Sequence, residues 1–113
     1  MAVYVVPGPV IAKIKGSQNR SMRFNSTIEL DATDSADTDT EGPSMGSLRV
    51  HWECEKEAPT PTKNCPCTLG NTSSPVLTIM ADDITSIHTR SRIVLVVSER
   101  DRRSRASIQL SVV

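Results

Sequence analysis

Three cysteines lie close together in the middle of this 113-residue chain, and their spacing limits the chemistry that they can do. Cys65 and Cys67 are separated by one proline, and a disulfide between them would be strained, so an intramolecular bond must include Cys54. We expect Cys54 to pair with Cys65 or Cys67, and we favour Cys65 slightly because Cys67 then lies beyond the closed loop. Closing such a loop stabilises a small domain by about 2 to 4 kcal/mol. The third cysteine is then either free or joined to another domain or chain.

The same cysteines fit a metal site poorly. One residue between Cys65 and Cys67 is too few for a zinc knuckle or for a thioredoxin-like redox pair. No fourth ligand is expected nearby, because His51 and His88 fall on or near expected strands. A disulfide is the favoured chemistry, and it indicates an oxidising compartment.

An acidic segment, residues 29–41, gives a second candidate site because it has many carboxylates and no basic residue. Its end has the opening spacing of an EF-hand loop, but Leu48 stands where that loop needs a bidentate glutamate, so an EF-hand is rejected. A looser calcium site would use Asp31, Asp34, Asp37 and Asp39. We favour the alternative of a solvated turn whose polar side chains satisfy their own backbone, and we expect no cofactor.

A basic segment near the end of the chain gives a third candidate site. Guanidinium groups bind sulfated or carboxylated glycans through paired hydrogen bonds, so an anionic glycan is the candidate ligand. We favour the alternative of a solubilising hairpin tip whose arginines pair with Glu99 and Asp101. The arginines concerned are Arg100, Arg102, Arg103 and Arg105.

Sequons for N-linked glycosylation begin at Asn19, Asn25 and Asn71. Asn71 lies beside Gly70 in an irregular segment, so we expect it to carry a glycan in a eukaryotic secretory host. Asn25 falls near the start of an expected strand and should be less fully occupied. With the cysteines, the sequons predict a module of a longer secreted or membrane-anchored protein.

Catalytic motifs are missing from the sequence. It contains no Gly-x-Ser-x-Gly elbow, no glycine-rich phosphate loop and no His-Glu-x-x-His motif, so we do not expect an enzyme. The formal net charge is zero, which gives no reason to expect nucleic acid as a partner.

Strands must position all of these residues. Leu48 to Cys54 alternates apolar and polar residues, so it predicts a central strand, and Trp52, the only tryptophan, is the expected centre of the core. Other strands are expected over 10–15, 24–30, 76–80, 92–98 and 106–112, separated by loops over 31–47, 55–74 and 99–105. This spacing predicts an all-β immunoglobulin-like or fibronectin type III-like β-sandwich of about seven strands, with a small barrel as the alternative. Residues 1–8 are expected to be a linker or the end of a preceding module, and 9–113 a single domain.

Four short motifs follow one another along the chain. They are the opening Pro9 to Ile14, the turn Leu30 to Asp37, the strand His51-Trp52-Glu53-Cys54 and the closing arginine-rich hairpin. Together these motifs resemble the REJ (receptor for egg jelly) and PKD-type repeats of polycystin-like membrane proteins. Thr33 stands where a serine is usual, and the Trp-Asp-Phe-Gly-Asp-Gly pattern of a PKD repeat is absent, which favours the REJ variety.

The resemblance implies a β-sandwich in the ectodomain of a large cell-surface or ciliary protein. The implied partners are neighbouring domains of the same parent chain and other surface proteins, among them a polycystin-type cation channel. The implied role is structural or adhesive, in spacing domains, resisting pulling or docking onto a partner. The competing interpretation is a receptor domain that binds calcium or an anionic glycan through its charged loops.

Overall fold

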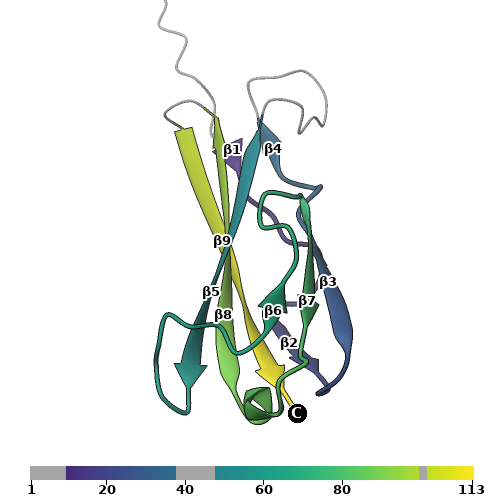
Figure 1. Cartoon of the computed structure of the whole chain (residues 1–113). Coiled ribbons are helices and arrows are strands. Elements are labelled where there is room, and N and C mark those ends of the chain that lie inside the picture. Colours follow the sequence, from purple (N-terminus) through teal and green to yellow (C-terminus); the bar gives the residue numbers. More distant parts are fainter. Residues whose placement is uncertain (1–9, 38–47, 100–101) are drawn as a thin grey trace, which may run out of the picture.

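The computed structural model describes residues 10–37, 48–99 and 102–113 (Figure 1). The expected linker over 1–8 lies outside these residues. The described strands are β1 (Val10–Ile11), β2 (Asn19–Met22), β3 (Thr27–Asp31), β4 (Ala36–Asp37), β5 (Arg49–Ala58), β6 (Thr68–Leu69), β7 (Val76–Met80), β8 (Arg90–Glu99) and β9 (Arg102–Val112). A short 3-10 helix, Ile84–Ser86, precedes β8. Within the described ranges, no helix is long and apolar enough to cross a membrane.

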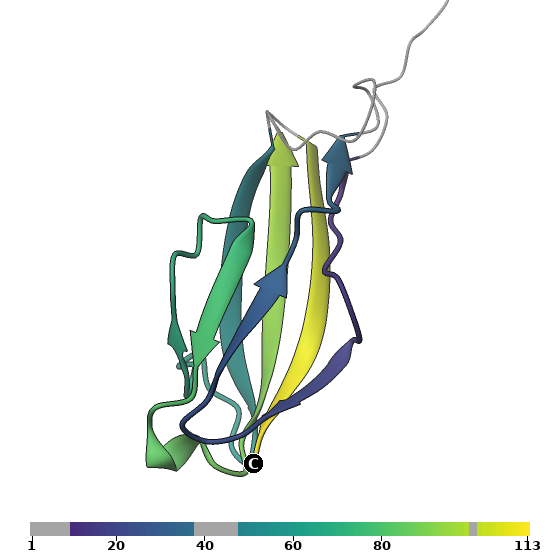
Figure 2. The same cartoon turned by 90° about the vertical axis from the view of Figure 1, so that its right-hand side faces the viewer.

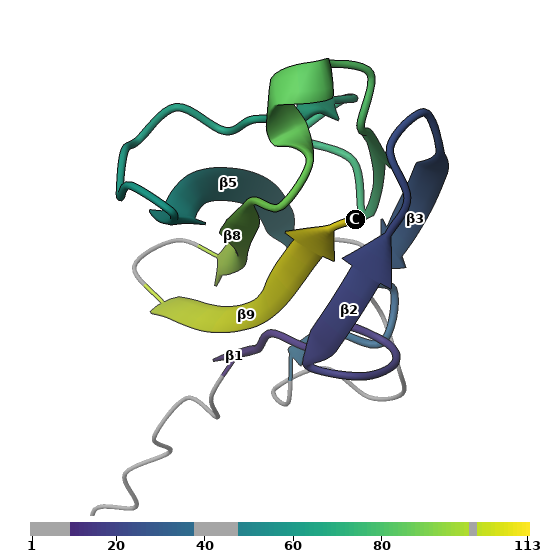
Figure 3. The ribbon, with the colours of Figure 1, turned by 90° about the horizontal axis from the view of Figure 1, so that it is seen from below.

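Two sheets face each other as the layers of a sandwich (Figure 3). One has the strand order β2-β9-β8-β5 and the other the order β3-β7-β6. Both neighbours of β8 are antiparallel to it, whereas β2 joins β9 in parallel. A small sheet of β1 and β4 lies at the end of the sandwich away from the C-terminus (Figure 2). The prediction of an all-β, immunoglobulin-like sandwich is confirmed.

The core lies between the two sheets because alternate residues of each strand point to opposite faces. Trp52 on β5 is 1% exposed and is the largest fully buried side chain. The other large apolar side chains buried to this degree are Leu30, Leu77, Ile79, Ile93, Leu95, Val97, Leu110 and Val112. Burial of such a side chain stabilises the fold by about 1.5 to 3 kcal/mol.

Near the start of the chain, the expected strand boundaries were wrong. Strand β1 ends at Ile11, and the backbone N–H groups of Ala12 and Lys13 donate to the hydroxyls of Ser104 and Ser35 in place of a strand partner. The next strand, β2, was missed, because its sequence Asn-Arg-Ser-Met lacks apolar alternation and it forms only by pairing with β9.

Three expected loops are partly strand. Strand β5 continues past Cys54 to Ala58, paired with β8, where an irregular loop was expected. Strand β9 begins at Arg102, so most of the expected hairpin loop over 99–105 is paired strand. The expected acidic loop also contains the short strand β4. Polar segments such as these become strands because a partner strand lies beside them, and their own sequence pattern does not reveal it.

Candidate functional site

A disulfide between Cys54 and Cys65 fastens the segment after β5 to that strand. The two α-carbons are 5.3 Å apart and eleven positions apart in the sequence. Of the two pairings that the sequence left open, the structure has the one with Cys65. Cys54 lies on the same side of β5 as Trp52, so the bond ties the proline-rich loop to the edge of the core.

Cys67 is the remaining cysteine, and it is free and packed into the core at 8% exposure. Burial raises the pKa of the Cys67 thiol, and the nearby Asp82 carboxylate raises it further. A thiol with a raised pKa is mostly protonated and is therefore a weak nucleophile. Cys67 is therefore part of the packing of the core.

Two loops cover the edge of β5 that faces away from β8. The backbone N–H of Trp52 donates to the carbonyl of Thr72 at 3.0 Å, and its indole N–H donates to the carbonyl of Ser74 at 2.8 Å. Farther along, Lys56 and Thr62 exchange two backbone hydrogen bonds. Trp52 thus anchors a loop as well as the core, a role that the sequence did not indicate.

The three sequon asparagines are all exposed. The side-chain oxygen of Asn71 accepts a hydrogen bond from the backbone N–H of Ser73 at 3.0 Å, in the loop that Trp52 anchors. Asn25 forms the turn between β2 and β3 with a φ of 71°, a left-handed conformation that Asn tolerates better than most residues. Asn19 lies in β2, opposite Gln109 of β9.

The acidic candidates make turn and ion-pair contacts where they are described. The Asp31 carboxylate accepts hydrogen bonds from the hydroxyl of Thr33 at 2.6 Å and from its backbone N–H at 2.8 Å, which hold the pKa of Asp31 below its ordinary value. The Lys15 ammonium lies 3.7 Å from both Asp31 and Asp34. Asp39 and the side chain of Asp37 lie outside the described residues. Among those described, no group of three or more His, Cys, Asp or Glu side chains is placed to hold a metal ion.

The arginine candidates are divided between the two sides of β9. Arg102 lies on the inner side of the strand and pairs with Glu99 at 3.0 Å. Arg103 and Arg105 are exposed on the other side, and Arg100 lies outside the described residues. The expected loop was therefore wrong for Arg102, Arg103 and Arg105, because they belong to a strand and alternate between its sides. The expected pairing of an arginine with Glu99 is confirmed at Arg102.

Pairing places the two exposed arginines on one broad surface, which we call the outer face. It is the side of β5, β8 and β9 that points away from the core. Its members are Arg49, His51, Glu53 and Glu55 on β5, Arg92, Val94, Val96 and Ser98 on β8, and Arg103, Arg105, Ser107 and Gln109 on β9. Sequence reasoning treated Arg49 and His51 only as the polar half of a strand. The register of β5, β8 and β9 brings them into the same rows as Arg103 and Arg105.

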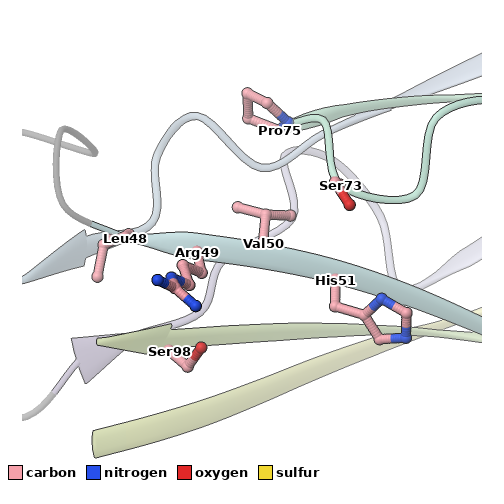
Figure 4. Close-up of a pocket in the computed structure, with 7 residues that line it drawn as sticks. All are labelled: Leu48, Arg49, Val50, His51, Ser73, Pro75 and Ser98. Carbon is pink, nitrogen blue, oxygen red and sulfur yellow. The ribbon is translucent and has the colours of Figure 1, made fainter. Parts of the chain in front are cut away.

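A hollow of about 590 Å³ lies where the outer face meets the edge of β5 beside the loop of Ser73 and Pro75 (Figure 4). Val50 points toward the loop of Ser73 and Pro75, whereas Arg49 and His51 point to the other side of the strand (Figure 4). The imidazole of His51 lies 3.5 Å from the Glu53 carboxylate. Within the part of the chain that is described, no serine of this hollow hydrogen-bonds to His51. The hollow therefore lacks a nucleophile and base in contact.

Together, the two-layer sandwich with its disulfide and its charged sheet face define an immunoglobulin-like β module. The family model of the REJ domain matches residues 1–113, and the chain belongs to this family. The REJ part of the resemblance is confirmed, and family and fold together indicate a non-catalytic module of extracellular type. No curated protein matches the chain.

Several solved structures share the fold. A nucleoside hydrolase-related hypothetical protein from Saccharophagus degradans is 13% identical with a TM-score of 0.71, and the match covers 95% of this chain and 26% of that one. The outer capsid protein Hoc of bacteriophage RB49 is 14% identical with a TM-score of 0.56, over 92% of this chain and 30% of that one. The Ig1-2 module of the Drosophila receptor protein tyrosine phosphatase DLAR is 12% identical with a TM-score of 0.52, over 95% and 48%. The chain spans less than half of each, and such identities show the fold alone.

Proposed function

We propose that this chain is a structural and adhesive module in the ectodomain of a larger polycystin-like membrane protein at the cell or ciliary surface. It spaces neighbouring domains, resists pulling and docks onto other surface proteins, a polycystin-type channel among them. The observation that carries this proposal is the parallel pairing of β2 with β9, which joins an early strand of the domain to its last strand.

Force applied to opposite ends of the chain would load this pairing in shear. Because β2 and β9 run in the same direction, pulling their two ends apart slides one strand along the other and strains all of their hydrogen bonds at once. The register runs from Asn19 opposite Gln109 to Met22 opposite Val112. The backbone bonds of Phe24 to the carbonyl of Val113, and of Val113 to that of Met22, extend it at 2.9 Å each. This arrangement supports a load-bearing role.

Single-molecule pulling on the whole chain tests the proposal. Arg20→Pro removes a backbone donor that points toward β9, whereas Ser21→Pro removes the next one, which points away, and serves as the matched control. We expect Arg20→Pro to unfold at a clearly lower force than both the wild type and Ser21→Pro. Equal unfolding forces for all three would contradict a load-bearing role.

The extracellular setting is tested on secreted material. Asn71 is exposed in a loop, so mass spectrometry of protein from a eukaryotic secretory host should find glycan there, with less at Asn25. Unmodified Asn71 together with three free thiols would contradict the proposed localisation.

A second candidate function is a receptor domain for an anionic glycan, and it rests on the exposed arginines of the outer face. A calcium site at the acidic segment belongs to the same receptor hypothesis. A ligand that binds only the folded state adds RT ln(1 + [L]/Kd) to stability. Melting temperatures that rise with a sulfated glycan or with calcium, and fall back with high salt or EDTA, would favour the receptor function over the structural one.

A further inference from the structure

The outer face carries a charge pattern that changes sign along β5. Arg49 and His51 occupy one half of the strand, and Glu53 and Glu55 occupy the other half, all four exposed. Figure 4 shows Arg49 and His51 on the same side of the strand. A surface with separate basic and acidic halves is complementary to a copy of itself turned end for end.

The register of the sheet extends this pattern across three strands. Paired residues lie side by side, so the outer face consists of rows perpendicular to the strands. In order, the rows are Arg49-Ser98-Arg103, His51-Val96-Arg105, Glu53-Val94-Ser107 and Glu55-Arg92-Gln109. Val96 and Val94 therefore occupy the two middle rows of the face, and Arg92 is the one basic residue in the half that holds Glu53 and Glu55.

We propose that a second copy of this chain packs on the outer face, about a two-fold axis. The axis lies in the plane between the two facing sheets and runs perpendicular to their strands. The axis passes between the row of His51 and the row of Glu53. Rotation about it places Arg49 opposite Glu55 of the second copy, and His51 opposite Glu53 of the second copy. The pairing deepens the proposed docking function, on which its biological setting rests.

This orientation opposes no two like charges in the four rows. On β8, the central valines face each other, and Ser98 faces Arg92 of the second copy. On β9, Arg105 faces Ser107 of the second copy, and Arg103 faces its Gln109. Each contact occurs twice, as the two-fold symmetry requires.

The other face-to-face orientation is unfavourable. A two-fold axis parallel to the strands would lay β5 of one copy over β9 of the other without reversing the rows. Arg49 would then meet Arg103, and His51 would meet Arg105. Like charges placed opposite each other suppress such a contact, so the charge pattern selects the first orientation.

Each exposed ion pair contributes only about 0.2 to 1 kcal/mol, so two isolated domains pair weakly. The apolar contribution is small as well. Val94 is only 8% exposed in the single copy, so pairing buries little more of its surface. When several copies are held on one surface, each domain meets its neighbour at an effective concentration in the millimolar range. A weak pairing becomes populated at about that concentration.

Sedimentation of the folded whole chain at low salt over a range of concentrations tests the proposal, because screening by salt is then weakest. We expect the wild type to form dimers as its concentration approaches the millimolar range. Arg49→Glu or Glu55→Arg alone opposes like charges twice per dimer, and each should weaken dimerisation by about tenfold or more, which corresponds to 1.4 kcal/mol. The double variant Arg49→Glu/Glu55→Arg restores opposite charges and should recover dimerisation close to the wild-type level.

Lys13→Glu is the matched control, because it changes the net charge as Arg49→Glu does but lies outside the outer face. It should leave dimerisation unchanged. A wild type that stays monomeric at all concentrations, or a double variant no better than its parents, would overturn the pairing. Either result would leave the pulling and melting results, on which the proposed function depends, unaffected.

Discussion

The two sides of the sheet formed by β5, β8 and β9 differ in almost every respect, although their residues alternate along the same strands. On the inner side, Trp52, Ile93 and Leu95 are at most 1% exposed. On the outer side, charged and polar side chains surround Val94 and Val96. Stability therefore depends on the inner side of the sheet, and the outer side is the one on which we propose that a second copy packs.

Trp52→Ala should have the largest effect, because it removes the largest buried side chain and the indole bond to Ser74. The expected loss of stability is about 3 to 5 kcal/mol, a large share of the total for a domain of this size. Thermal or denaturant unfolding measures it, and Trp52→Phe, which removes the indole N–H and only part of the ring volume, should cost less. A cooperative Trp52→Ala variant that melts like the wild type would contradict the central role of this side chain.

Cys65→Ser should have the next largest effect. The variant lacks the disulfide between β5 and the loop that follows it, so the unfolded chain gains conformational entropy. The expected loss of folding stability is about 3 kcal/mol. Cys67→Ala is the comparison variant, because it keeps the disulfide and removes only one sulfur from the core. Reduction of the wild type should lower the melting temperature, and a non-reducing peptide map should link the Cys54 peptide to the peptide that contains Cys65. Equal melting temperatures for the oxidised and reduced protein would show that the disulfide does not stabilise the fold.

The thiol of Cys67 should react slowly in the folded protein. Burial and the Asp82 carboxylate raise its pKa, so the reactive thiolate is scarce at neutral pH. Because the raised pKa favours the protonated form, reactivity should rise with pH only above the usual range for a thiol. Alkylation followed by mass spectrometry should label Cys67 quickly in denaturant and slowly without it. Equal labelling rates would mean that this part of the core opens readily.

Arg103→Ser on the outer side should have the smallest effect on stability. The side chain is exposed, and substitutions at such positions usually change stability by less than about 0.5 kcal/mol. Denaturant unfolding measures the change, and the inner residue Ile108 on the same strand provides the contrast as Ile108→Ala. A loss for Arg103→Ser as large as for Ile108→Ala would contradict the separation of roles between the two sides.

Much of this organisation is encoded locally in the sequence. The alternation from Leu48 to Cys54 predicts a strand with one buried side, and β5 and the burial of Trp52 agree with it. The single proline between Cys65 and Cys67 leaves Cys54 as the partner in any internal disulfide, and the structure has such a bond. Both inferences succeed because they depend only on chain geometry between near neighbours.

Only the tertiary structure decides the features that depend on which segments pair. The sequence of β2 gives no sign of a strand, and it becomes one because the edge of β9 lies beside it. The packing of Cys67 into the core leaves Cys65 to reach Cys54. Arg49 and Arg103 are far apart in the sequence, yet they share a row because β8 pairs with both of their strands. A shift of one residue in either register would move every side chain of the strand to the opposite face, so no local pattern could place these charges together.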